Sequence, residues 1–147
     1  MLLEVKKYII NRKSYSNNYC LAKDIKPEKE VGMETFLVFF YILDLGYEYC
    51  KGDDLGGFLG SISPELWEDG YPADMAILDD WNRFEPQKKI NKLNIINEIY
   101  DFLNDYEKEF GYDFHETRLW LVNEVDDEIV EKAIAKSKIM MQRHEYE

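Results

Sequence analysis

The sequence predicts a mainly α fold, a compact helical bundle in one domain spanning residues 1–147. Apolar residues recur every three to four positions in residues 88–110 and again beyond Asp126, which is the period of a helix with one buried face. Hydrophobic residues make up 46% of the 147-residue chain and aromatic residues 15%, enough for one hydrophobic core. The same pattern leaves room for a short strand or hairpin.

The first third of the chain contains an N-terminal segment and connector, residues 1–30, followed by a buried helix. Residues 2–13 mix the periods of helix and strand, and residues 14–30 are polar. Residues 31–51 are apolar on almost every side, which suits a helix in the middle of a bundle, and Gly52 is expected to end it. A buried strand is the competing interpretation, because Val, Phe, Tyr and Ile also favour sheets.

This buried helix opens a motif-bearing helical region, residues 31–87. A short helix is expected over Leu55–Ser61, with Asp53 or Asp54 accepting a backbone N–H at its start. Three glycines lie inside it and predict the close approach of another element, rather than a phosphate loop, because the specific spacings are absent. They are Gly56, Gly57 and Gly60.

A break at Pro64 and a turn at Asp69-Gly70 separate this short helix from the next. Pro72-Ala73-Asp74 then leads into a helix over Met75–Phe84.

The C-terminal region, residues 88–147, is predicted as helices. The helix over residues 88–110 is ended by Gly111, and residues 114–124 form either another short helix or a strand. Asp126 is expected to cap a last helix. One face of that helix carries Ile129, Val130, Ala133, Ile134, Ser137, Met140 and Met141.

The charge is strongly acidic and unevenly distributed. The net charge is −12, and residues 31–86 carry twelve Asp and Glu against two Lys and Arg. Such a field repels nucleic acid and attracts basic partners, although net charge also serves solubility alone. The start of the chain lacks the pattern of a secretory signal, and its longest apolar run, residues 36–43, is too short to span a membrane. We therefore expect a cytoplasmic protein that binds neither nucleic acid nor a membrane.

We expect no catalytic residues, no cofactor and no metal. The two cysteines, Cys20 and Cys50, form no CxxC motif and are interpreted as reduced thiols. Neither His115 nor His144 follows a Glu or Asp by three residues, as a di-metal carboxylate bundle requires. An enzyme would need His115 to meet Cys50 or a carboxylate in space.

The three tryptophans differ in their surroundings. Trp81 and Trp120 lie within apolar patterns and are expected in the core. Trp67 lies in the turn ELWEDG, where it either contacts a basic partner by packing and cation–π attraction or folds back as a lid on the core.

Three short motifs together resemble a known family. They are DDLGGFLGSIS from Asp53 to Ser63, DGYPAD from Asp69 to Asp74, and DDW from Asp79 to Trp81. Their order is similar to that in the immunity proteins of contact-dependent growth inhibition and related polymorphic toxin systems. The resemblance covers roughly residues 33–84, and Met75 departs from it. It implies a protein that binds a cognate toxin domain in the cytoplasm and blocks it.

The predicted partner is therefore a toxin with a basic surface. The alternative is an acidic helical interaction or regulatory subunit unrelated to toxins. The predicted interface comprises Glu65, Trp67, Glu68, Asp69, Tyr71, Asp79 and Asp80, whose acids are expected to be exposed. If these acids do not bind the partner, the acidic residues 124–131 are the next candidate. The sequence leaves the oligomeric state open.

Overall fold

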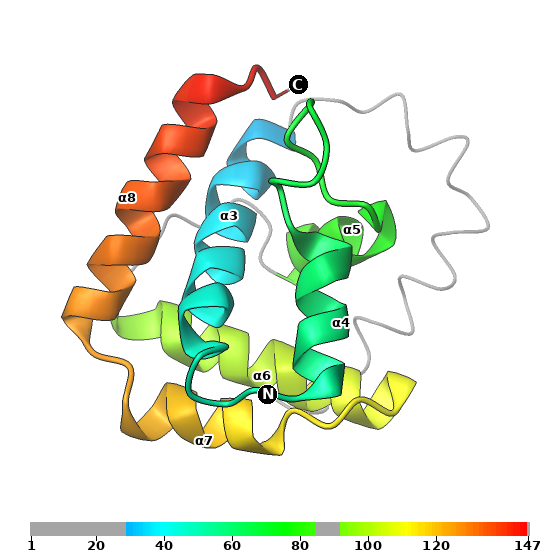
Figure 1. Ribbon diagram of the computed structural model, residues 1–147, viewed down its shortest axis with the longest axis vertical. Helices are drawn as coiled ribbons and strands as arrows, with labels where there is room; N and C mark the ends of the chain where they lie inside the picture. The colour runs from blue at the N-terminus through cyan, green and yellow to red at the C-terminus, as the bar shows by residue number, and fades with distance from the viewer. Residues whose placement is uncertain (1–28, 85–91, 147) are drawn as a thin grey trace.

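A computed structural model describes residues 29–84 and 92–146 of the chain. Over these residues the fold is all-α, as predicted, with six helices and no strand (Figure 1). The predictions for residues 2–13, for the connector up to residue 28, for Cys20 and for the helix start at residues 88–91 lie outside the described residues. The helices are α3 (Lys29–Gly46), α4 (Asp53–Ile62), α5 (Met75–Phe84), α6 (Lys92–Phe110), α7 (His115–Asn123) and α8 (Asp127–Arg143).

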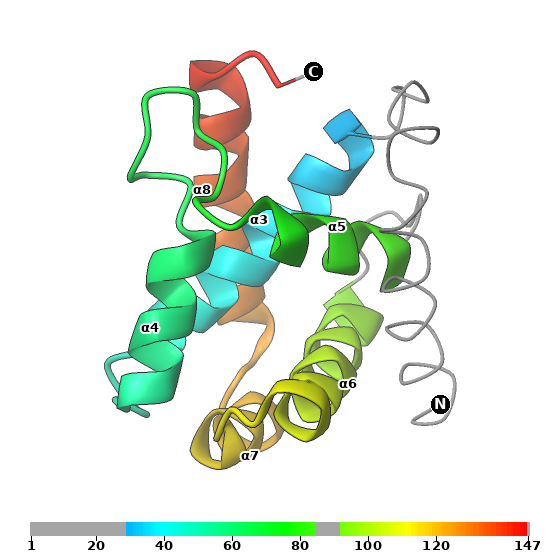
Figure 2. The same cartoon turned by 90° about the vertical axis from the view of Figure 1, so that its right-hand side faces the viewer.

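Helix α3 is the centre of the fold. In Figure 1, α8 and α4 flank it, and α6 and α7 run across the end at which α3 finishes. Figure 2 shows α6 and α7 side by side at that end, while the connection between α4 and α5 lies at the other end, near the C-terminus. The α3 helix contacts α8, α5, α4 and α7, which explains why it is apolar on all sides.

The core is an aromatic cluster around α3. The Phe39 ring stacks on Trp81 with centroids 4.4 Å apart and meets the edge of Phe102 at 5.3 Å. The Trp81 indole N–H donates to Thr35 Oγ1 at 2.9 Å, so the buried polar end of this ring is satisfied. Trp81 and Trp120 are both buried, which confirms their predicted place in the core. The competing interpretation of residues 31–51 as a strand is wrong.

The predicted end of α3 at Gly52 is also wrong. The helix ends at Gly46, and a turn follows in which the Cys50 N–H donates to the Gly46 carbonyl at 3.0 Å. A Cβ atom at Gly46 would lie 2.5 Å from the Trp120 ring, so only glycine lets α7 come this close. Gly52 instead precedes the first residue of α4.

Two expectations about α4 need correction. Asp53 and Asp54 lie in its first turn, and neither caps it, since Gly52 is at the cap position. The Asp54 carboxylate instead accepts from the Asp113 N–H at 2.7 Å, which ties α4 to the segment before α7. The close approach predicted from the three glycines occurs only at Gly56, where a Cβ atom would lie 3.2 Å from the Tyr47 hydroxyl oxygen, and Gly57 and Gly60 face open space.

The remaining helices follow the sequence closely. Helix α5 has the predicted bounds, and α6 ends before Gly111, which adopts φ 80°. Residues 114–124, left open between helix and strand, contain the helix α7. The Asp126 carboxylate caps α8 by accepting from the Ile129 N–H at 3.1 Å, as predicted.

Candidate functional site

The connection between α4 and α5, residues 63–74, presents two large apolar side chains to solvent, and we call it the Trp67 loop. Trp67 is 59% exposed and its neighbour Leu66 is 61% exposed. Of the two positions that the sequence allowed for Trp67, the surface position is correct and the lid is not. The sequence analysis did not predict that Leu66 is exposed, although Leu66 lies beside Trp67 in the same ELWEDG turn.

Internal hydrogen bonds hold the Trp67 loop in shape. The Asp74 N–H donates to the Ser61 carbonyl at 2.9 Å and closes its base. At its tip the Gly70 N–H donates to the Trp67 carbonyl at 3.1 Å, and the Tyr71 N–H donates to Asp69 Oδ1 at 3.0 Å. Gly70 has φ 78°, a conformation that other residues rarely adopt. The loop is therefore structured around the exposed Trp67.

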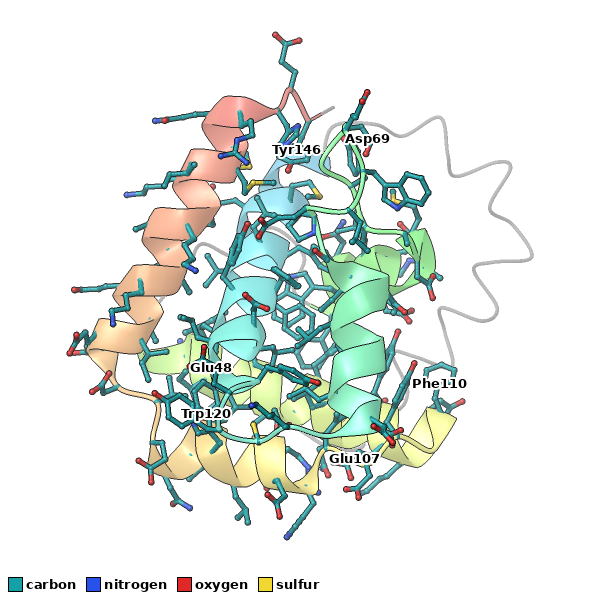
Figure 3. The ribbon with its side chains drawn as sticks, in the orientation of Figure 1. Glu48, Asp69, Glu107, Phe110, Trp120 and Tyr146 are labelled. Atoms are coloured by element: carbon teal, nitrogen blue, oxygen red, sulfur yellow. The ribbon has the colours of Figure 1, made fainter. Side chains whose placement is uncertain are left out.

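Residues 144–146, the C-terminal segment that follows α8, support the Trp67 loop by direct contact. The Tyr146 hydroxyl donates to the Gly70 carbonyl at 3.1 Å, and its ring meets Tyr71 edge to face at 5.2 Å. A Cβ atom at Gly70 would lie 2.5 Å from the Tyr146 oxygen and 2.7 Å from His144. Figure 3 shows Tyr146 close to Asp69 at this end of the molecule. Sequence reasoning missed Tyr146 and His144, because they follow Gly70 by more than seventy residues.

Burial also keeps the Tyr146 hydroxyl in its donor form. Tyr146 is 4% exposed, and its removal from water is the main cause that raises its pKa to about 12, with smaller contributions from Tyr71 and Asp69. The phenol is therefore protonated at neutral pH and can donate to Gly70.

Acidic side chains surround the exposed Leu66 and Trp67. Glu65, Glu68 and Asp69 are all exposed, as predicted, and Glu65 accepts from the Tyr41 hydroxyl at 3.1 Å. The chain contains no Lys, Arg or His between Lys51 and Arg83. The loop thus combines an apolar tip with a local negative field.

The aspartate pair of α5 behaves differently from the prediction. Asp80 is only 1% exposed and accepts a hydrogen bond from the Tyr106 hydroxyl, so the expectation that it is an exposed acid is wrong. Asp79 is half-buried, and so is Tyr71, which packs on Tyr146. The exposed acids of the predicted interface are therefore those of the loop, and Asp80 belongs to the interior.

The residues considered for catalysis occupy different environments. His115 is exposed at the start of α7, whereas Cys50 is buried and its thiol donates to the Gly46 carbonyl at 3.0 Å. Burial is the main cause that raises the pKa of the Cys50 thiol, which keeps it protonated and poorly nucleophilic. Within residues 29–84 and 92–146, no three His, Cys, Asp or Glu side chains are grouped so that they could hold a metal ion.

No described helix has the length and apolar character needed to cross a bilayer. Comparison with known proteins finds no match to a family model, to a curated protein or to a solved structure.

Proposed function

We propose that this chain is a cytoplasmic immunity protein that binds a cognate bacterial toxin domain and neutralises it without catalysis. The Trp67 loop is the proposed contact surface. The observation that carries the proposal is the exposure of Leu66 and Trp67, 61% and 59%, at the tip of an acidic loop that is hydrogen-bonded at its base and braced by Tyr146.

A structured loop with an exposed tryptophan has the features of a binding hot spot. Trp is enriched among the residues that dominate binding energy, and neighbouring polar contacts exclude water around it. Because the loop is already ordered by Gly70 and Tyr146, little conformational entropy is lost when it binds. Because the loop is ordered, Trp67 is presented in one position, which favours a partner with a complementary surface.

The charge pattern supports a basic partner. Glu65, Glu68 and Asp69 lie beside Trp67 in a segment without any cationic residue. Toxins that act on nucleic acids have basic clefts, because they must bind phosphate. Carboxylates presented in place of phosphates would cover such a cleft, and opposite charges would speed the encounter. The resemblance of residues 53–81 to immunity proteins supports the toxin as the partner.

Co-expression with the toxin-like domain encoded beside this gene tests the proposal. We expect restored growth and a stable complex that survives purification. A matched co-expression with the Leu66→Ser, Trp67→Ser double variant should restore growth poorly, although the variant folds, because both side chains already face water. If no neighbouring gene product is neutralised or bound, the toxin function is wrong and an interaction subunit with another basic partner takes its place.

A further inference from the structure

A second candidate surface lies at the opposite end of α3 from the Trp67 loop. A groove of about 660 Å³ opens where the turn after α3 meets α7 and the start of α8, and we call it the Tyr49 groove. Figure 3 shows Trp120 and Glu48 at this end and Asp69 at the other. The groove is lined by Tyr49, Leu119, Trp120, Asn123, Glu124 and Ile129.

The floor of the Tyr49 groove is aromatic. The Trp120 ring is held against the backbone of Gly46, and the Tyr49 ring stacks on it with centroids 6.1 Å apart and planes inclined by 16°. Tyr49 is nevertheless 71% exposed, and Leu119 on the adjoining helix is 50% exposed. An exposed aromatic face with an exposed leucine beside it is typical of a protein contact surface.

The rim of the groove is acidic. Glu124 lines the groove itself, and a smaller hollow of about 310 Å³ shares Tyr49 and Ile129 with it and adds Asp44 and Glu48. Residues 123–131 contain five acidic residues and no Lys or Arg.

Two lysines, Lys132 and Lys136, also line the smaller hollow. The Lys132 ammonium lies 3.7 Å from the Glu128 carboxylate, and the Lys136 ammonium lies 5.8 Å from the centre of the Tyr41 ring. Both cations thus interact with groups of this chain. The net charge of the residues that line the groove and the smaller hollow remains negative.

We propose that the Tyr49 groove is a docking site for a basic amphipathic segment of a protein. An apolar side chain of that segment packs on Leu119, beside the stacked rings of Tyr49 and Trp120, and a neighbouring Lys or Arg lies over the exposed face of Tyr49. Glu124 and Glu48 are placed to pair with this cation. The proposal does not depend on the toxin function, because the groove and the Trp67 loop lie at opposite ends of the molecule.

A peptide-display selection against the immobilised full chain at about 0.15 M salt tests this site, since exposed charges are partly screened there. Enriched peptides are expected to combine Lys or Arg with a large apolar residue. The best one, made synthetically, should bind Glu124→Lys and Leu119→Ser at least about tenfold more weakly than the unaltered chain, the loss of one well-placed contact. Trp67→Ala should leave its affinity unchanged.

Three results would overturn the proposal. One is a selection that enriches no basic peptide. Another is a basic peptide whose affinity is the same for the unaltered chain, Glu124→Lys and Leu119→Ser. The third is a peptide that loses affinity with Trp67→Ala and not with the groove variants, which would place cationic binding at the Trp67 loop. Failure of the toxin function would change none of these readouts, because no toxin is present.

Discussion

Gly46 illustrates how one residue sets the position of a helix. A Cβ atom there would lie 2.5 Å from the Trp120 ring, so the end of α3 and the face of α7 touch without a side chain between them. Glycine disfavours helix, and α3 ends at this position. The contact joins residues far apart in sequence, which is why the sequence pattern suggested Gly52 instead.

Gly46→Ala is expected to lower the free energy of unfolding by about 1–3 kcal/mol, because the added methyl group must displace the buried Trp120 ring. Gly57→Ala is the matched control. Its Cβ atom meets open space within α4, so the change should raise stability by about 0.5–1 kcal/mol. Urea unfolding of both variants measures these differences, and equal effects of the two changes would contradict the packing described for Gly46.

Asp79 and Asp80 show where sequence reasoning about single residues fails. Adjacent acids on a short helix point in different directions, and the sequence alone gave no reason to prefer one as buried. Asp80 is buried because the Tyr106 hydroxyl on α6 donates to it, a partner 26 residues away. Trp81 and Trp120, by contrast, were predictable, because the apolar residues around them left only the core.

At the scale of elements, the Trp67 loop and the C-terminal segment form one unit. Tyr146 donates to the Gly70 carbonyl and packs on Tyr71, so the segment that follows α8 supports a loop near the middle of the chain. Helix bounds marked by local signals were predictable, as with Asp126 at the start of α8 and Gly111 after α6. The hydrogen bond from Tyr146 to Gly70 was not predictable, because no local sequence signal joins these two residues.

Loss of this brace should loosen the loop selectively. Tyr146→Phe removes the hydrogen bond to Gly70 but keeps the ring, and we expect amide hydrogen exchange in residues 63–74 to accelerate several-fold. Exchange in α6 should stay unchanged. Glu145→Gln, an exposed neighbouring change, is the control. Uniform acceleration in every helix, or none in the loop, would show that Tyr146 does not hold the loop.

The same brace predicts a dependence on alkaline pH. Burial raises the pKa of Tyr146 to about 12, above its ordinary value of 10.0, so the folded protein holds this proton more tightly than the unfolded chain. Its contribution to stability is complete below pH 10 and is lost as the pH rises towards 12. The free energy of unfolding should therefore fall over this range less steeply for Tyr146→Phe than for the unaltered chain. If the free energy of unfolding falls equally steeply with pH in the two proteins, the raised pKa is wrongly assigned to Tyr146.

Helix α7 shows the limit of periodicity for a short element. Its central residues, Leu119 to Val122, are all apolar, a run that fits a strand as well as a helix. In the fold Trp120 and Leu121 are buried, while Leu119 and Val122 are exposed. Contacts with α3 and α6 decide the structure, and these contacts leave half of the apolar residues facing water.

At the scale of the whole molecule, charge is the dominant property. The net charge is −12, and the exposed acids of the Trp67 loop lie in the most acidic part of the chain. A field of this sign attracts a basic partner over a distance of about the Debye length, near 8–10 Å in physiological salt. The composition alone predicts a basic partner, whereas the surface proposed to meet that partner could be chosen only once the fold was known.

Charge reversal at Glu68 and Asp69 to Lys should slow association with the toxin about tenfold or more at low salt and flatten its salt dependence. Stopped-flow fluorescence measures both. The control is reversal of Glu34 and Glu116, two exposed acids outside the loop, which changes the net charge by the same amount. Equal slowing by the two pairs would mean that the overall charge, and not the loop, steers the encounter.

The central claim is that the toxin binds at the Trp67 loop, and the affinity of Trp67→Ala for the purified toxin domain tests it most directly. Val122→Ala, which truncates an equally exposed apolar side chain on α7, is the control. We predict that Trp67→Ala raises Kd by about 30-fold or more, a loss of about 2 kcal/mol, while Val122→Ala changes it little. An unchanged Kd for Trp67→Ala in a correctly folded protein would contradict the claim.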